Sequence, residues 1–186
     1  MKKLLILILA VLILPGCGTK ETAIETPAEE TVTEVSANAF GTFSAVTLNG
    51  ETVTESIFAE ADLTVVNLWG TFCGPCIQEM PTLGILHKEL ENVQVLGIVL
   101  DCNNQFGGVD PDQAALAADI MEQAGANYPS LVLNESLAAI GMANFQYIPT
   151  TMFVNKDGNV VGSEIVGAMD ETAWRQTITE RLEMAQ

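Results

Sequence analysis

The feature that most limits the possible folds is a pair of cysteines placed between a buried strand and a helix. The segment LTVVNLW (residues 63–69) is a largely apolar run, typical of a strand buried on both faces of a sheet. Cys73 and Cys76 follow it, and residues 76–91 carry apolar side chains at helical spacing. This strand–cysteine–helix unit predicts an α/β domain with the cysteine pair at the end of a sheet strand.

The segments around this unit continue the alternation of strands and helices. An Asn49-Gly50 turn between two short alternating runs predicts an N-terminal β-hairpin. The other predicted elements are a strand at 93–100, a helix from Asp110-Pro111 to near Gly125, a short helix at 137–144, a hairpin turning at 155–159 and a helix from Asp170 onward. Parallel strands with helical connections, plus antiparallel edge strands from the late hairpin, predict a three-layer α/β domain over residues 40–186.

The N-terminus predicts export and a lipid anchor. Two lysines precede an apolar run over residues 4–14, which is shorter than the about 20 residues that span a bilayer core. Such a run after positive charges is typical of an export signal. The ending Leu14-Pro15-Gly16-Cys17 resembles a bacterial lipobox. This resemblance implies that residues 1–16 are a signal peptide and that the Cys17 thiol carries diacylglycerol.

Residues 17–39 are predicted to be a flexible, acidic tether, because they are rich in Glu, Thr and Ala and contain no aromatic residue. The whole chain holds 24 Asp and Glu against 7 Lys and Arg, a formal charge of −17. This charge excludes nucleic acid as a partner, because the phosphates would be repelled. The sequence therefore predicts a globular domain tethered outside the cytoplasm by its lipid.

The cysteine spacing admits three interpretations: a redox couple, half of a zinc site, or two core thiols. A zinc site needs about four ligands. Apart from the pair and Cys17, the chain offers only Cys102 and His87, and His87 falls about three turns along the same predicted helix. Two core thiols at this spacing would oxidise in an exported chain. A redox couple is therefore the favoured hypothesis.

The two cysteines are predicted to have different roles. Cys73 falls at the N-terminus of the helix, where free N–H groups and the helix dipole lower the pKa of a thiol. Cys76 lies one turn further into the helix and is expected to be more sheltered, while Pro75 fits the first helical turn. This asymmetry suits a two-step exchange, in which Cys73 attacks a disulfide and Cys76 resolves the mixed disulfide.

A second motif, far along the chain, gives these residues a family resemblance. Trp69, the Cys73-Gly74-Pro75-Cys76 core, Pro81 and the later Ile148-Pro149-Thr150-Thr151 together resemble the thioredoxin fold. The lipoprotein signal, the early hairpin, Glu79 and an insertion around residues 102–113 resemble the TlpA/ResA-like membrane-anchored thiol-disulfide oxidoreductases. The resemblance covers about residues 40–184. It implies a thioredoxin-like three-layer fold with a mixed central sheet, an N-terminal β-hairpin and flanking helices.

The resemblance also implies roles for individual residues. It implies that the peptide bond before Pro149 is cis, and that the main chain of Ile148 pairs with an incoming peptide as an extra strand. The other residues expected to bind the substrate are Trp69, Phe72, Gly74 and Pro75. Cytoplasmic thioredoxins carry a buried Asp where this chain has Asn67. Because Asn67 cannot take up the proton of Cys76, Glu79 is the expected substitute.

These features predict an extracytoplasmic protein-disulfide reductase that needs no cofactor and no metal. The Gly-Pro dipeptide between the cysteines matches that of thioredoxin, whose potential is about −270 mV. The resemblance implies protein clients such as apocytochrome c, and an integral-membrane thiol donor of electrons. One alternative is a disulfide-forming oxidase, and another is a copper-binding module, which would normally use a distal histidine. Cys102, just past a predicted strand, is either a second resolving or regulatory thiol or an inert buried residue.

Overall fold

The computed structural model describes residues 39–104 and 108–186. The predicted signal peptide (1–16), the predicted lipidation at Cys17 and the predicted tether as far as residue 38 lie outside the described residues. Ala39, which the sequence analysis placed in the tether, pairs with Asn159 through a β-bridge and so belongs to the domain. Among the described helices, none combines the length and the apolar character needed to cross a membrane.

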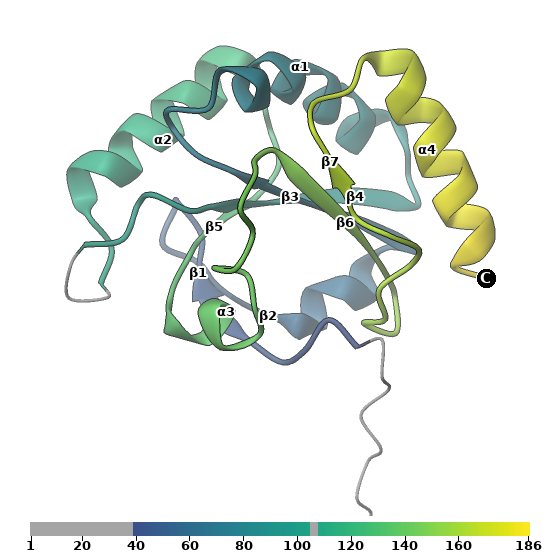
Figure 1. Ribbon diagram of the computed structural model, residues 1–186, viewed down its shortest axis with the longest axis horizontal. Coiled ribbons are helices and arrows are strands. Elements are labelled where there is room, and N and C mark those ends of the chain that lie inside the picture. The colour runs from purple at the N-terminus through teal and green to yellow at the C-terminus, as the bar shows by residue number, and fades with distance from the viewer. Residues whose placement is uncertain (1–38, 105–107) are drawn as a thin grey trace, which may run out of the picture. The chain divides into compact units, whose positions relative to one another are not determined.

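A five-stranded mixed sheet forms the centre of the domain (Figure 1). Its strands are β3 (Leu63–Trp69), β4 (Val93–Val99), β5 (Ser130–Val132), β6 (Thr150–Asn155) and β7 (Ile165–Val166). The spatial order is β5-β4-β3-β6-β7, in which β3, β4 and β5 are parallel and β6 and β7 are antiparallel to their neighbours. Because β3 is the middle strand, the cysteine motif that follows it lies at the centre of the sheet's edge, where sites in open α/β sheets form.

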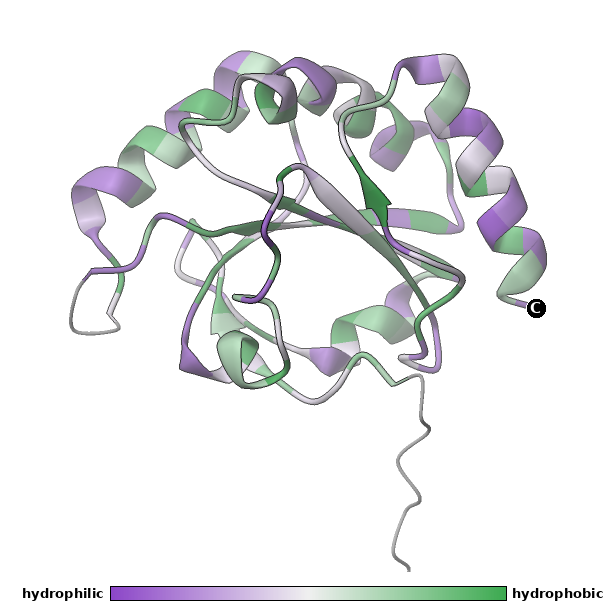
Figure 2. Cartoon of the chain, in the orientation of Figure 1, coloured by the Kyte–Doolittle hydropathy of each residue, from purple (hydrophilic) through white to green (hydrophobic). Residues whose placement is uncertain are grey.

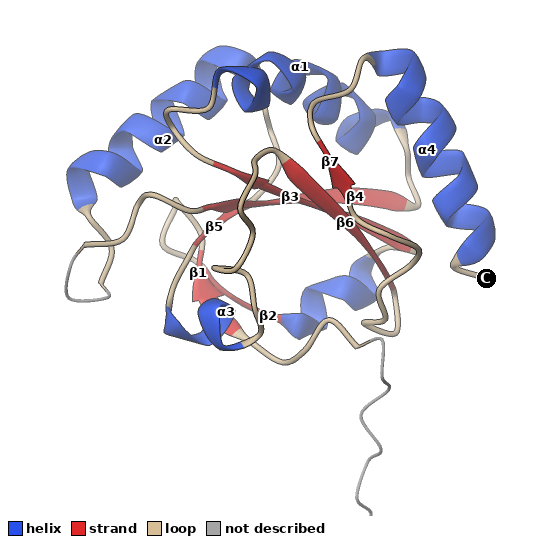
Figure 3. Cartoon of the chain, in the orientation of Figure 1, coloured by secondary structure: helices blue, strands red, loops and turns tan. Residues whose placement is uncertain are grey.

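Helices and a hairpin cover the two faces of this sheet and complete three layers (Figure 3). One face carries α1 (Gly74–Glu89), α2 (Pro111–Ala124) and α4 (Glu171–Met184). The other carries the hairpin of β1 (Ser44–Val46) and β2 (Thr52–Thr54), the 3-10 helix Glu55–Glu60 and α3 (Glu135–Ala139). This arrangement confirms the predicted three-layer α/β domain with an N-terminal hairpin.

The side chains of β3 alternate between two hydrophobic cores. Val65 and Trp69 belong to the core beneath α1, α2 and α4, whereas Val66 and Leu68 belong to the core on the hairpin side. Figure 2 shows the corresponding pattern, with hydrophobic residues along the central strands and mixed hydropathy along the helices. Asn67 shares the orientation of Val65 and Trp69, because side chains two residues apart in a strand point to the same face. The strand therefore directs a polar side chain toward α1.

The helix boundaries follow residues that the sequence marks. Cys73 is the N-cap of α1, Asp110 that of α2 and Asp170 that of α4, and the side chain of each accepts a backbone N–H of the first turn. Gly125 ends α2 in the left-handed conformation, with φ at 67°. The predicted starts of these three helices and the stop of α2 are confirmed.

Other details differ from the prediction. The strand β5 was missed because three residues are too few to show periodicity, and the 3-10 helix was missed as well. The helix expected at 137–144 spans Glu135–Ala139 instead, because Asn134 caps it and Gly141, with φ at 94°, follows its end. The late hairpin supplies one antiparallel edge strand, β7, as predicted, but its other strand, β6, lies inside the sheet between β3 and β7.

Candidate active site

Cys73 and Cys76 form a disulfide at the N-terminus of α1, with their Cα atoms 5.3 Å apart. The chain leaves β3 at Trp69, and a turn closed by a 3.0 Å hydrogen bond from Cys73 N–H to the Gly70 carbonyl brings Cys73 to the N-cap. Its Sγ accepts the N–H of Cys76 at 3.3 Å. The sulfur therefore lies where the helix presents free N–H groups, as expected for a stabilised thiolate.

The two cysteine residues differ in exposure. Cys73 retains 6% of its surface and Cys76 none. Gly74 and Pro75, between them, are exposed, and Phe72, immediately before Cys73, has 76% of its surface exposed. The prediction that Cys76 is the more sheltered thiol is confirmed, and the face around Cys73 is the one that another molecule can reach.

Glu79 lies one turn beyond Cys76 in α1 and is almost fully buried. Its Oε1 accepts Nδ2–H of Asn67 at 3.0 Å, and its Oε2 accepts the N–H of Met169 at 3.2 Å. Burial raises the pKa of the Glu79 carboxyl, while these two hydrogen bonds and the nearby indole of Trp174 act in the opposite direction. A buried carboxyl with a raised pKa exchanges protons closer to neutral pH than an exposed one.

Asn67 is a member of this site that the sequence analysis did not recognise as a partner of Glu79. Besides Glu79, its Nδ2 donates to Oγ1 of Thr151 in β6 at 3.0 Å. Its Oδ1 is buried and has no partner among the described residues. The available signal was a single amide in the largely apolar strand β3, at a position that points toward α1. Asn67 thus holds the carboxyl rather than taking up a proton itself.

The second predicted motif adjoins the first. The Ile148–Pro149 peptide bond is cis, as predicted, and the Gly167 N–H donates to the Pro149 carbonyl at 2.9 Å. A Cβ built on Gly70 would lie 2.9 Å from the Phe72 ring and 3.2 Å from Cδ1 of Ile148, so both side chains cover that glycine. Within the described part of the chain, the main-chain N–H and carbonyl of Ile148 make no hydrogen bond.

A pocket of about 360 Å³ lies beside this loop. Tyr147 and Thr150, which flank the Ile148–Pro149 bond, line it together with Val166 of β7. Tyr147 and Val166 expose 68% and 57% of their surfaces. The loop therefore offers an open main chain next to a partly apolar hollow.

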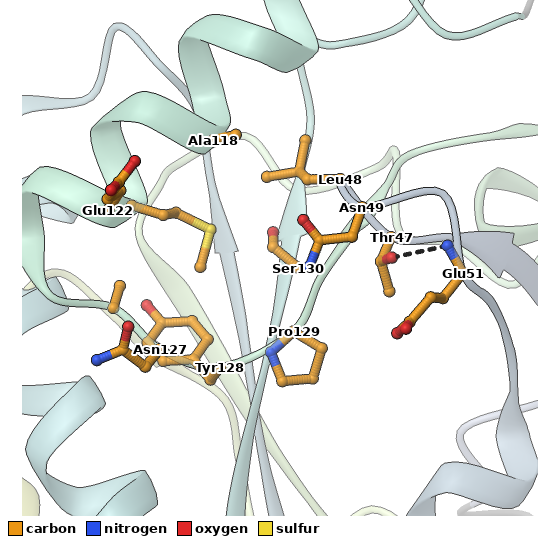
Figure 4. A pocket seen from close by; sticks show the side chains of 12 residues that line it. Thr47, Leu48, Asn49, Glu51, Ala118, Glu122, Asn127, Tyr128, Pro129 and Ser130 are labelled. Atoms are coloured by element: carbon orange, nitrogen blue, oxygen red, sulfur yellow. Dashed lines mark hydrogen bonds between the residues drawn. The ribbon is translucent and has the colours of Figure 1, made fainter.

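The Trp69 side chain, one of those expected to bind the substrate, has no surface through which it could contact one. Trp69 is fully buried, and its indole N–H donates to Oγ of Ser130 in β5 at 3.0 Å. Ser130 also lines a separate pocket of about 510 Å³ between the β1–β2 turn, α2 and the start of β5 (Figure 4). None of the predicted site residues lines that pocket. Trp69 thus belongs to the core that supports the cysteine loop, as does Trp174 of α4.

The remaining described cysteine is fully buried, and the histidine is partly buried. Cys102 has no exposed surface, and its thiol donates to the Gln113 carbonyl at 3.4 Å. Burial, together with the charges of Asp101 and Asp110, raises the pKa of Cys102 to about 12, which favours the inert interpretation. Nδ1 of His87 accepts the N–H of Val95 at 3.1 Å. Across residues 39–104 and 108–186, no three His, Cys, Asp or Glu side chains are grouped as metal ligands would be.

Fold and site together define a thioredoxin-like domain with an oxidised C-x-x-C pair, and comparison with known proteins agrees. Residues 27–178 match the redoxin family, and the chain belongs to that family. Among solved structures, a thiol:disulfide interchange protein of the thioredoxin family from Chlorobium tepidum TLS superposes with a TM-score of 0.63 at 22% identity, covering 78% of this chain and 96% of that one. That likeness confirms the predicted thioredoxin-like fold.

Curated relatives carry names from the same class of chemistry. "Thiol-disulfide oxidoreductase ResA" of Bacillus anthracis is 30% identical over 103 residues, which are 55% of this chain and 53% of the relative. "Thiol:disulfide interchange protein DsbE" of Pseudomonas aeruginosa is 28% identical over 124 residues, 64% of this chain and 61% of the relative. The matches thus span little more than half the length of these relatives. The resemblance to TlpA/ResA-like proteins noted from the sequence is confirmed.

Proposed function

We propose that this protein is an extracytoplasmic thiol-disulfide oxidoreductase that reduces disulfides of exported proteins, such as apocytochrome c. The observation that carries the proposal is the Cys73–Cys76 disulfide at a helix N-terminus, with a buried carboxyl one turn further along the same helix. A structural disulfide alone would not need a buried acid beside it. The names of the ResA and DsbE relatives support the same reaction class.

The proposed reaction starts from the dithiol form. The Cys73 thiolate attacks one sulfur of a client disulfide, so that a mixed disulfide forms and the other client sulfur leaves as a thiolate. Cys76 then loses its proton and attacks Sγ of Cys73, which releases the second client thiolate. Two electrons pass from the pair to the client, and the pair ends as the disulfide present in the structure. A dithiol donor, which we propose to be an integral-membrane protein, returns the pair to the reduced form.

Glu79 is proposed to accept the proton that Cys76 must lose. Cys76 is fully buried, so its thiol has no direct route to solvent. Glu79 is nearly as buried, and its raised pKa makes it a stronger base than an exposed carboxylate. Asn67 and Met169 hold the carboxylate in place through its two oxygens.

The client is proposed to bind as an extended strand along Ile148. The main chain of Ile148 has both hydrogen-bonding groups free among the described residues, which suits β-strand addition. Phe72, Gly74 and Pro75 would form the opposite wall beside Cys73, all of them exposed. The pocket next to Tyr147 would take a client side chain.

The proposed location is the outer face of the cell membrane, with Cys17 lipidated. Support comes from the export-type N-terminus and its lipobox-like ending, which lie outside the described residues. The anchor would keep the domain close to a membrane-embedded electron donor. The Gly-Pro dipeptide supports reduction as the direction, by analogy with thioredoxin's potential.

The test is the reduction potential of the pair in the detergent-solubilised full chain, equilibrated in glutathione or dithiothreitol buffers. Trypsin cuts after Lys20 and Lys88, so one peptide (21–88) carries Cys73 and Cys76 without Cys17 or Cys102. Differential alkylation of that peptide therefore reports the pair alone. A potential at or below about −270 mV supports a reductase, whereas one well above about −200 mV would make the protein a disulfide-forming oxidase.

The resolving role of Cys76 has its own test. A Cys76→Ser variant should accumulate a mixed disulfide between Cys73 and a disulfide-containing peptide, because the second step is blocked. The matched Cys73→Ser variant should accumulate none, since Cys76 is buried. Equal trapping by both variants would contradict the assignment of nucleophile and resolving thiol.

A further inference from the structure

A hydrogen-bonded network of three side chains holds the loop that precedes Cys73. The Asp101 carboxylate, just past the end of β4, accepts the N–H of Thr71 at 3.1 Å from each oxygen and the Thr71 hydroxyl at 2.6 Å. Gln113, in the first turn of α2, donates from Nε2 to Oγ1 of Thr71 at 2.6 Å and to Oδ2 of Asp101 at 3.2 Å. The network therefore joins three segments: the loop after β3, the end of β4 and the start of α2.

Further hydrogen bonds connect the two segments that carry Asp101 and Gln113. The N–H of Asp110 donates to the Cys102 carbonyl at 2.8 Å, and the Asp110 side chain accepts the N–H of Gln113 at 3.1 Å. The Gln113 carbonyl in turn accepts the buried Cys102 thiol. These hydrogen bonds hold the segment after β4 against the start of α2. Asp101 and Gln113, which belong to these two segments, are therefore restrained when they bind Thr71.

This restraint acts close to the reactive sulfur. Thr71 precedes Cys73 by two residues, and the turn between them is closed by the Cys73–Gly70 hydrogen bond. Given the span of two residues, the Asp101 carboxylate lies at most about 12 Å from the Cys73 Cα. At that range, in a half-buried loop, a negative charge still acts on a neighbouring ionised group.

We propose that Asp101 is a positioning residue of the redox site: with Gln113 it fixes the Thr71 segment that presents Cys73, and its negative charge disfavours the Cys73 thiolate. The thiolate exists only in the reduced pair, so a charge that opposes it favours the disulfide and makes the couple more reducing. The inference rests on the proposed redox use of the pair but not on the identity of its clients.

The first test is Asp101→Asn in the full chain, read by alkylation of the 21–88 peptide in glutathione buffers. The variant keeps a side-chain acceptor for Thr71 and removes the charge. We expect the equilibrium to move about threefold toward the dithiol, equivalent to about 14 mV at 29.6 mV per tenfold change. Asp119→Asn, on an exposed position of α2, removes the same charge further along the helix and should leave the equilibrium unchanged.

The second test separates the restraint from the charge. Gln113→Ala retains Asp101 but removes the two hydrogen bonds that Gln113 Nε2 donates, one to Thr71 and one to Asp101. It should therefore slow attack by Cys73 on a model disulfide severalfold, while the equilibrium stays within about 1.5-fold of the wild type. This variant also keeps the proposal testable if Asp101→Asn does not fold. If Asp101→Asn shifts the equilibrium no more than Asp119→Asn, and Gln113→Ala reacts at the wild-type rate, the positioning role is refuted. A wild-type pair with no reversible couple would instead overturn the proposed function itself.

Discussion

Replacing Asn67 by alanine should destabilise the domain by an amount that follows from its contacts. The buried Nδ2 donates to the Glu79 carboxyl and to the Thr151 hydroxyl, each at 3.0 Å. A hydrogen bond to a charged group contributes about 1.5–3 kcal/mol and a neutral one about 0.5–1.5 kcal/mol. The substitution also removes Oδ1, which has no partner among the described residues. We therefore expect a net loss of about 2 kcal/mol in the free energy of unfolding, near the lower end of the sum.

The same substitution should change how stability depends on pH. Burial raises the pKa of Glu79 above its ordinary 4.5, and the bond from Asn67 opposes that rise, so the pKa should rise further in Asn67→Ala. A group with a raised folded-state pKa binds its proton more tightly in the native state. The stability that Glu79 contributes is therefore fully present below about pH 4.5 and is lost as pH rises toward its folded-state pKa. In Asn67→Ala this fall should continue to higher pH than in the wild type.

Urea unfolding of the oxidised protein at a series of pH values measures the stability, and NMR of the glutamate side-chain carboxyl carbons measures the titration of Glu79. Thr151→Val is the matched control, because it removes the other partner of Asn67 and leaves the bond to Glu79 intact. It should cost about 1 kcal/mol and leave the Glu79 titration in place. The reasoning is refuted if Asn67→Ala costs no more than Thr151→Val and Glu79 titrates as in the wild type.

Three further outcomes follow from burial. Leu83→Ala, at a fully buried position of α1, should cost about 2–5 kcal/mol in urea unfolding, and a loss below about 1 kcal/mol would contradict its place in the core. Partial burial lowers the pKa of His87, so the stability that His87 contributes should be lost as pH drops below about 6.5. His87→Gln should abolish that part of the pH profile. Cys102, whose pKa is raised to about 12, should resist iodoacetamide at pH 8 in the native protein and react after unfolding in urea. Rapid alkylation of Cys102 in the native protein would contradict the inert interpretation and support a regulatory role for this thiol.

The sequence was sufficient for the parts of the fold that depend on local pattern. The apolar run of β3, the caps at Cys73, Asp110 and Asp170, and the stop at Gly125 each act within a few residues, so the elements that they bound could be predicted. Strand β5 could not, because three residues carry no period and its place beside β4 depends on pairing across the chain. The position of β6 inside the sheet could not be predicted either, because strand order depends on pairing between segments far apart in the chain.

The same distinction between local motifs and long-range contacts applies to the candidate active site. The cysteine pair and the cis-proline loop are contiguous motifs, whereas the partners of Glu79 come from β3 and from the segment before α4, 12 and 90 residues away in the chain. The Thr71–Asp101–Gln113 network likewise spans three segments. Sequence spacing says that Glu79 follows Cys76 by one turn. Whether that carboxyl is buried, and which groups hold it, depends on how α1 lies over the sheet.

The location of the acid on α1 rather than on β3 has a consequence for the proposed chemistry. Glu79 belongs to the same helix as Cys76, and the N-cap of that helix is Cys73, whereas Asn67 lies on β3. The Asn67 amide and the Met169 N–H are donors to Glu79, and neither is a base that could take the proton that Cys76 releases. Both bonds favour the charged carboxylate while burial favours the neutral acid, so these opposing effects set the proton affinity of Glu79. Under the proposed mechanism, the Asn67 amide on β3 thus adjusts the proton affinity of Glu79 on α1. A substitution of Asn67 should therefore alter the pH dependence of the step in which Cys76 attacks the mixed disulfide, although Asn67 contacts neither sulfur.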